Sequence, residues 1–399
     1  MTGELFSGFA FLAAGAQGAA AIPLAMLLVF GSAKLLAEIC ERFNQPGIVG
    51  EILAGVLIGP SVLAWISPDQ FLTTMSELGV MFLLFRVGLE VKASELLRVG
   101  GTATLVATLG VVAPFFLGWG ILRLWGEPHT ESIFVGAAMV ATSVGITARV
   151  LSAGGLLRKR FAQIILAAAV IDDVLGLLVL ALVGSLARGR VNALELSLTA
   201  ALAIGFTVLV AAWGSKTMRR FVPHMEGRLR AQEAQFALAV TLLFALSLLA
   251  VYAGVAAIVG AFLAGMALAE SVGQRVQDLA HGVAELLVPF FLVGIGLRVD
   301  LAAFTHPSVA ALAAVIVVAA ILSKLVGCGL GAYRLGRAEA LRVGLGMVPR
   351  GEVGMVVAQL GLSMGVIRQD IYGVVVFMSV ATTLLAPLLL TVGQRPKRA

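Results

Sequence analysis

Long apolar stretches recur along this chain from end to end, and short polar segments separate them. A transmembrane helix needs about 20 consecutive apolar residues to cross a bilayer. The 399 residues are 60% hydrophobic and 13% charged, whereas soluble chains carry about 25% charged residues. The pattern therefore predicts an all-α polytopic membrane protein and excludes a soluble domain.

The apolar segments predict about thirteen transmembrane helices. They cover residues 18–41, 47–66, 71–90, 99–124, 131–153, 161–187, 193–214, 231–252, 254–270, 281–299, 308–333, 339–363 and 369–392. Lysine and arginine orient them, because inward loops are rich in these residues. With the N-terminus outside, the inward segments hold eighteen of them, and the outward loops hold five: Arg123, Arg188, Arg190, Arg298 and Arg368. We therefore expect a multi-pass protein of the cell (inner) membrane, with a cytoplasmic C-terminus.

Two pairs of segments indicate an internal repeat. IVGEILAGVLIG (48–59) resembles IVGAFLAGMALA (258–269), and ELGVMFLLFRVGLEV (77–91) matches ELLVPFFLVGIGLRV (285–299) at eight of fifteen positions. The pairs divide the chain into a six-helix unit at 1–188, a linker helix at 189–216 and a second six-helix unit at 217–399. A displacement by seven helices gives the units opposite orientations, which is the inverted-repeat architecture of many secondary transporters.

Two adjacent aspartates, Asp172 and Asp173, interrupt the apolar segment AAAVIDDVLGLLVL (167–180). Each aspartate at a membrane centre costs about 2.5–3.5 kcal/mol. Consecutive helical residues point about 100° apart, so the two face different surroundings. Lys324, mid-span in the eleventh helix, is the predicted partner of one of them. Ionisable residues inside membranes indicate a functional site, and a structural salt bridge is the alternative.

Equivalent spans of the two units are interrupted by helix-breaking residues. GAAMVATSVGITARVL (136–151) clusters Thr142 and Ser143 mid-span, and GLGMVPRGEVGMVV (344–357) contains Pro349, with Arg350 and Glu352 beside it. Broken helices free backbone carbonyls, and inverted-repeat transporters bind substrate at such breaks. Close packing of small, kinked helices remains an alternative for the first cluster. A buried carboxylate beside such oxygens can hold either a proton or a small cation, which is the minimum machinery of an antiporter.

At these residues the chain resembles the second family of the monovalent cation/proton antiporter superfamily, and within it the NapA-type sodium/proton antiporters. The resemblance covers essentially the whole chain. It rests on QPGIVGEILAGVLIGPSVL (45–63), GLE (88–90), ATSVGITARVL (141–151), VIDDVLGL (170–177), Lys324 and VPRGEV (348–353). It implies a homodimer in which the first three spans of each unit, 18–90 and 231–299, form a dimer domain. The last three, 99–187 and 308–392, would form an elevator-type core domain with two broken crossing helices.

The resemblance also implies roles for individual residues. Asp173 would carry either a proton or Na+ (or Li+), and Asp172 would pair with Lys324. A paired aspartate with this lysine is typical of electrogenic relatives, which implies two protons per cation. Further expected site residues are Thr142 and Ser143 at the ion site, and Glu352, Arg350 and Arg149 in support or in the pH response. The expected substrates are monovalent cations and protons, in contact with the lipid bilayer, without cofactor, enzymatic activity or nucleic acid.

Other functions stay open at this point. Potassium/proton exchange in the same family is the nearest alternative, and a sodium-coupled solute symporter is another. An intramembrane aspartyl protease needs two carboxylates on separate helices, and here they are adjacent. Two arginines also need an explanation: Arg86 can snorkel or pair with Glu90, and Arg149 can bind a carboxylate or a lipid phosphate.

Overall fold

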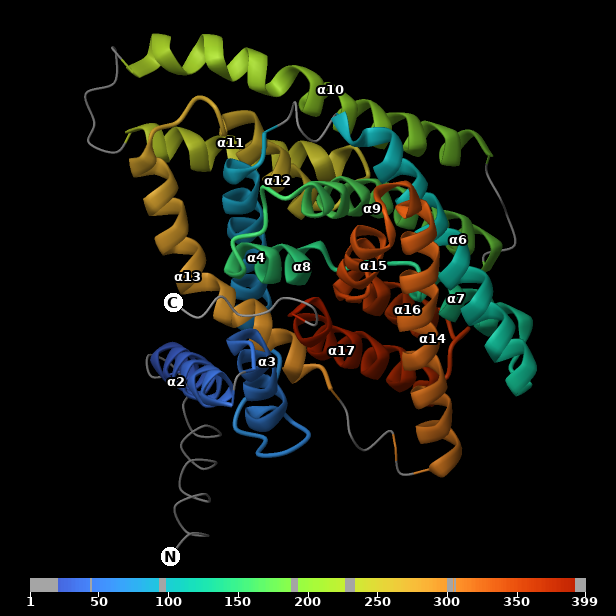
Figure 1. The fold of residues 1–399 in the computed structure, drawn as a ribbon. Coiled ribbons are helices and arrows are strands. Elements are labelled where there is room, and N and C mark those ends of the chain that lie inside the picture. Colours follow the sequence, from blue (N-terminus) through green and yellow to red (C-terminus); the bar gives the residue numbers. More distant parts are fainter. Residues whose placement is uncertain are drawn as a thin grey trace, which may run out of the picture.

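The regular structure of this chain is helical wherever it is described (Figure 1). The computed structural model describes residues 21–43, 45–92, 98–187, 193–226, 234–299, 304 and 306–391. Its helices are α2 (Ala21–Arg42), α3 (Gly47–Ile58), α4 (Gln70–Glu90), α6 (Gly100–Trp125), α7 (His129–Ala138), α8 (Val144–Ala153), α9 (Arg160–Ala187), α10 (Ala193–Glu226), α11 (Ala234–Tyr252), α12 (Ala257–Leu268), α13 (Gln274–Leu297), α14 (Pro307–Gly331), the 3-10 helix η3 (Tyr333–Leu335), α15 (Arg337–Gly346), α16 (Glu352–Ser363) and α17 (Gln369–Thr391). The all-α prediction is confirmed, and the predicted positions of both chain ends lie outside the described residues.

Eight of the described helices are long and apolar enough to cross a membrane, by length and composition: α2, α4, α6, α9, α11, α13, α14 and α17. Shorter apolar helices lie at Gly47–Ile58, Val144–Ala153, Ala200–Gly214, Ala257–Leu268 and Val353–Leu362. A helix as short as α3, with 12 residues, rises only about 18 Å, less than the roughly 30 Å of a bilayer core. The chain is a multi-pass membrane protein, and the number of thirteen crossings stays a prediction.

Three predicted boundaries differ from the observed helices by more than five residues. The span predicted to begin at residue 281 begins at Gln274, as α13. The span predicted at 47–66 ends as a helix at Ile58, and Gly59 adopts an extended conformation. The cause is Pro60, because a proline disfavours the helical conformation of the residue before it. The linker helix predicted to end at residue 216 continues instead to Glu226 as part of α10.

The helices form two bundles that lie side by side (Figure 1). The first bundle contains α2, α3, α4, α11, α12 and α13, and the second contains α6 to α9 and α14 to α17. Helix α8 links them, because Gly145 lies against Val80 of α4 and Phe291 of α13. Both interrupted helices, α7–α8 and α15–α16, therefore belong to the second bundle. Of their four halves, α8 packs against the first bundle.

Glycines let the helices of the first bundle cross backbone to backbone. A Cβ atom added to Gly55 of α3 would lie 2.1 Å from the carbonyl oxygen of Val293 in α13. One added to Gly265 of α12 would lie 2.0 Å from the carbonyl oxygen of Phe85 in α4. Gly55 and Gly265 occupy the same position in the two repeated segments, as do Phe85 and Val293. Matching positions of the two predicted repeats thus make matching contacts.

We expect Gly265→Ala to destabilise the protein, because its methyl group would meet a backbone carbonyl that no side-chain rotation can move. Overpacking of this kind costs about 1–3 kcal/mol. Thermal unfolding in detergent measures the effect as a lower melting temperature. The matched control is Gly120→Ala in α6, where an added Cβ meets nothing within 4 Å. Equal melting temperatures for the two variants would contradict the assignment of Gly265 to a close crossing.

Candidate functional site

The two interrupted helices touch each other at their breaks. Helix α7 ends at Ala138 and α8 begins at Val144, while α15 ends at Gly346 and α16 begins at Glu352. The backbone N–H of Ser143 donates a hydrogen bond to the carbonyl oxygen of Pro349 at 2.8 Å. The hydroxyl of Thr147 donates to the carbonyl oxygen of Gly346 at 2.7 Å. The two non-helical segments therefore hold each other in place.

The sequence explains why the helices break at these points. Pro349 has no backbone N–H and disfavours a helical conformation at Val348. At Gly351 an added Cβ would lie 2.6 Å from the Ser143 hydroxyl oxygen, so the missing side chain makes room for the other break. Each break therefore leaves backbone groups unpaired at a point where the opposite break is close enough to accept or donate hydrogen bonds.

Arg350 is fully buried and serves the carbonyls that the first break leaves free. Its Nη1 atom donates to the carbonyl oxygens of Val140 and Ala141, each at 3.2 Å. Its Nη2 atom donates to the carbonyl oxygen of Ala320 in α14 at 3.0 Å. Buried backbone acceptors need such partners in the absence of water. Arg350 thus ties the first break and α14 to the second break.

Two hydroxyls of α17 fix the backbone of Arg350. Thr382 accepts a hydrogen bond from the Arg350 N–H at 3.2 Å, and Thr383 donates to the Arg350 carbonyl oxygen at 2.7 Å. Sequence reasoning missed both residues. The signal was the polar pair in the otherwise apolar segment 380–390, because a buried hydroxyl needs a partner.

Lys324 and Asp172 form a buried ion pair between α14 and α9. The Lys324 Nζ atom lies 3.1 and 3.3 Å from the two carboxylate oxygens of Asp172, and both side chains are inaccessible to solvent. Gly110 of α6 leaves space for the lysine, because a Cβ there would lie 3.3 Å from Nζ. The two residues that the repeat placed opposite each other are therefore in contact.

The remaining predicted ion-site residues are also buried. Asp173 follows Asp172 on α9 and is 7% exposed, and Thr142 and Ser143 are each 3% exposed. The hydroxyl oxygens of Thr142 and Ser143 make no hydrogen bond to any residue that the structure describes. Oxygen atoms of this kind, hydroxyl and carboxylate, are the ligands that hard cations prefer. The side chain of Glu352 lies outside the described residues.

Glu285 of α13 explains both arginines that the sequence left open. Arg149 of α8 lies 2.6 Å from Glu285, and Arg86 of α4 lies 3.4 Å from it. Arg86 also approaches Glu90 at 3.8 Å, as one of the sequence alternatives expected. Glu285 therefore joins the two bundles, and Arg149 binds a carboxylate, which is one of the two partners that the sequence left open for it. Sequence reasoning did not single out Glu285.

Comparison with known proteins shows the family of this chain. Residues 25–392 match the family described as "Sodium/hydrogen exchanger, transmembrane". The chain belongs to this family. Its members are transporters, which confirms the resemblance to cation/proton antiporters that the sequence motifs indicated.

Several curated relatives align over nearly their whole length. The exchanger is 34% identical to the high-affinity Na+/H+ antiporter NhaS3 of Synechocystis sp., over 92% of this chain and 88% of the relative. It is 32% identical to the Na+/H+-K+ antiporter GerN of Bacillus cereus, over 93% of this chain and 96% of the relative. It is 31% identical to a Na+/H+ antiporter of Enterococcus hirae, over 92% of this chain and 96% of the relative.

Solved structures show a similar fold. The exchanger superimposes on the sodium proton antiporter MjNhaP1 of Methanocaldococcus jannaschii at pH 8 with a TM-score of 0.67 and 19% sequence identity. The match covers 98% of this chain and 100% of the other. An EM map of the same protein gives a TM-score of 0.72 over 96% of this chain. This likeness concerns the fold alone.

We expect Arg350→Met to lower both stability and transport, because it removes three hydrogen bonds between a charged donor and buried carbonyls. Hydrogen bonds to charged groups contribute about 1.5–3 kcal/mol each. Thermal unfolding in detergent and cation exchange in proteoliposomes measure the two effects. The control Arg337→Met changes an exposed arginine at the start of α15. If Arg350→Met melts and transports like this control, Arg350 does not hold the breaks together.

Proposed function

We propose that this exchanger transports Na+ or Li+ in exchange for protons, with Asp173 as the shared carrier. The observation that carries the proposal is the different surroundings of the two adjacent aspartates. Asp172 pairs with Lys324, whereas Asp173 is buried on the same helix, α9, which packs against α7, α8 and α16 of the broken helices. Burial disfavours an ionised carboxylate unless a positive charge accompanies it. In this proposal Asp173 binds a proton and a cation in turn.

The chain offers enough oxygen atoms for a small cation. The carboxylate of Asp173 would supply the charge, and the hydroxyls of Thr142 and Ser143 would supply neutral ligands. Carbonyls at half-helix ends act in the same way in other inverted-repeat transporters. At this site Arg350 already occupies the carbonyls of Val140 and Ala141. The side-chain oxygens are therefore the main ligands in this proposal.

Lys324 would account for a second proton. An ammonium group without its carboxylate is costly to bury. A cation that draws the Asp172 carboxylate toward itself would leave Lys324 unpaired, and Lys324 would then release its proton. Two protons against one monovalent cation move one net charge per cycle, so the exchange is electrogenic in this proposal.

Alternating access would come from a movement of the second bundle against the first. The equivalent glycine crossings support two copies of one unit, an arrangement on which many secondary transporters build such movement. In this proposal the first bundle is the dimer domain of a homodimer, with boundaries 18–90 and 231–299. The second bundle, 99–187 and 308–392, is the elevator core. The N-terminus would face outside and the C-terminus the cytoplasm.

We expect Asp173→Asn to reduce exchange to the rate of empty proteoliposomes, because a neutral amide cannot carry either ion. Asp172→Asn and Lys324→Ala should retain Asp173 but change the number of protons per cation. Sodium-driven pH change in proteoliposomes measures all three. The control Asp278→Asn changes an exposed aspartate of α13 and should transport normally. Full activity in Asp173→Asn would rule out the proposed carrier.

We also expect the wild-type rate to depend on membrane potential. One net charge per cycle gains about 2.3 kcal/mol of driving force per 100 mV. A potential set with potassium and valinomycin, negative on the side that the protons enter, should accelerate exchange, and the opposite potential should slow it. Lys324→Ala provides the comparison, because loss of the second proton would make its exchange electroneutral. Wild-type rates indifferent to the potential would contradict the stoichiometry.

Potassium/proton exchange is the second candidate. GerN, 32% identical to this chain, is named a Na+/H+-K+ antiporter, so potassium transport fits this degree of similarity. Sodium, lithium and potassium gradients compared in the same proteoliposomes distinguish the candidates. A sodium-coupled solute symporter would instead show uptake of a solute without proton counterflow.

A further inference from the structure

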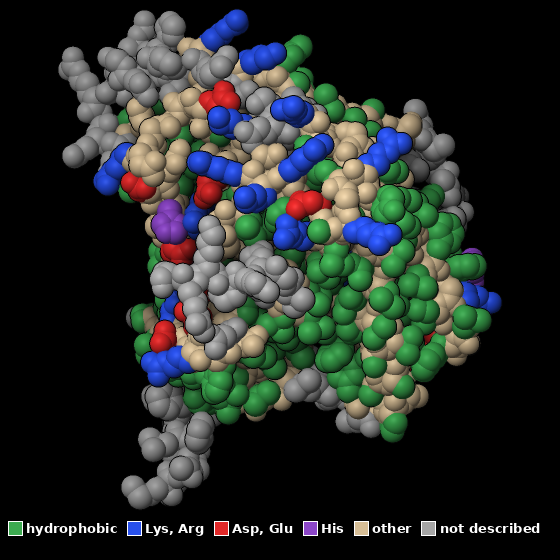
Figure 2. Space-filling model, in the orientation of Figure 1, with side chains coloured by type: hydrophobic (Ala, Val, Ile, Leu, Met, Phe, Trp, Pro, Cys, Tyr) green, Lys and Arg blue, Asp and Glu red, His purple; other side chains and the backbone are tan. Residues whose placement is uncertain are grey.

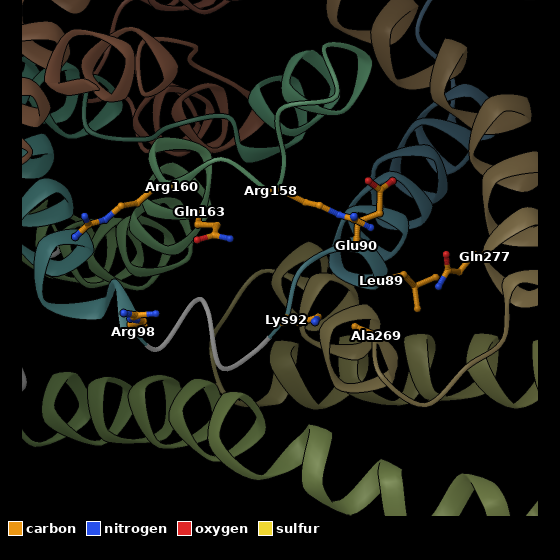
Figure 3. A pocket seen from close by; sticks show the side chains of 9 residues that line it. All are labelled: Leu89, Glu90, Lys92, Arg98, Arg158, Arg160, Gln163, Ala269 and Gln277. Carbon is orange, nitrogen blue, oxygen red and sulfur yellow. The ribbon is translucent and has the colours of Figure 1, made fainter. Parts of the chain in front are cut away.

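A basic cavity separates the two bundles at the end of α4. It has a volume of about 730 Å³ and is lined from both sides (Figure 3). The first bundle and the segment after α4 contribute Leu89, Glu90, Lys92, Ala269 and Gln277, and the second bundle and its loops contribute Arg98, Arg158, Arg160 and Gln163. The cavity is distinct from the crossing of the broken helices, because none of its lining residues belongs to that crossing.

Positive charge dominates this cavity. Four cationic side chains line it, Lys92, Arg98, Arg158 and Arg160, and Glu90 is the one carboxylate among the lining residues that the structure describes. None of the four cations makes an ion pair with a carboxylate that the structure describes. Lysine and arginine also gather on the upper part of the molecular face in Figure 2. The positive-inside rule explains basic loops, but it does not explain why cations from separate segments line one cavity.

The chemistry of the lining selects a class of ligand. Arginine binds phosphate oxygens through two parallel hydrogen bonds, and three of the four cations are arginines. The volume lies within the range of about 300–1,000 Å³ that is typical of small-molecule sites, which suits several linked phosphates better than one. Among the described residues of the lining, only Leu89 and Ala269 are apolar. A lipid acyl chain would therefore find little apolar wall to pack on.

We propose that this cavity binds a soluble polyphosphate anion of nucleotide size, and that the bound anion slows exchange by holding the two bundles together. Binding follows from the cavity alone. The effect on transport rests on the proposed function, because it requires the bundles to move against each other. By the predicted orientation of the loops, the cavity opens to the cytoplasm, where nucleotides are abundant.

Binding is tested first, without a gradient, by isothermal titration of the detergent-solubilised full chain with ATP. Arg158→Gln and Arg160→Gln should each weaken binding by about tenfold, because each removes charge-assisted hydrogen bonds. Lys159→Gln is the matched control: it removes a cation between these two residues that does not line the cavity. Glu90→Gln should tighten binding, because it removes a negative charge from the lining. Melting temperatures near that of the wild type verify that the variants are folded.

The source of the phosphate is tested in parallel. Inorganic triphosphate should bind and compete with ATP, since the cavity recognises phosphate groups. Nanodiscs of phosphatidylcholine alone should preserve ATP binding, and the addition of phosphatidic acid should not displace it. Displacement by phosphatidic acid, with no binding of ATP in its absence, would assign the site to a lipid headgroup and overturn the soluble ligand. Equal ATP binding by wild type, Arg158→Gln and Lys159→Gln would overturn the site itself.

Transport is measured last, in proteoliposomes with ATP on the side of the cavity. We expect ATP to slow sodium-driven proton movement in the wild type and in Lys159→Gln, but not in Arg158→Gln. A wild type that exchanges normally and binds no ATP would refute this inference and leave the proposed function intact. A wild type that binds ATP but exchanges no cation would refute the proposed function and leave the site intact. Binding without any effect on the rate would overturn the claim that the anion holds the bundles together.

Discussion

The buried guanidinium of Arg350 is the interaction on which the arrangement of this exchanger depends. A helix interrupted inside a membrane exposes carbonyls that neither lipid nor water can satisfy. Arg350 satisfies those of Val140 and Ala141 from the opposite break, and one more in α14. Burial of an isolated cation costs several kcal/mol, and the same hydrogen bonds offset that cost. Arg350 therefore stabilises both breaks at once.

Two buried cations of the second bundle are compensated in different ways. Arg350 is surrounded by neutral carbonyls, whereas Lys324, one turn beyond Ala320 in α14, faces the carboxylate of Asp172. A carbonyl cannot change its charge, but a carboxylate can be protonated or can bind a cation. The first arrangement is therefore suited to a permanent tie. The ion pair of Lys324 and Asp172 can instead form and break repeatedly, and Asp172 is the residue directly before Asp173 on α9.

The sequence predicted those features of the fold and the site that depend on rare residues within apolar segments, such as charges and prolines. Charges are so rare in apolar segments that Asp172 and Lys324 could be paired through the repeat, and Pro349 marked its own break. The partners of the Arg350 side chain could not be predicted, because they are backbone carbonyls, which carry no sequence signal. Glu285 lies 199 and 136 positions from its two arginines, so no local pattern links them. The end of α3 was misjudged although Pro60 marks it, because the span was assigned by hydropathy and the segment after Pro60 remains largely apolar.

The glycine crossings of the first bundle have a consequence for how this protein can vary. Where α3 meets α13 and α4 meets α12, main-chain atoms touch directly. The distance between these helices is then set by the polypeptide backbone, which is the same in every sequence, and not by side-chain volume. Residues on the outer surfaces of the helices can be exchanged for others of different size without altering the crossing. Such a scaffold can adapt its surface to membranes of different composition while its geometry stays constant.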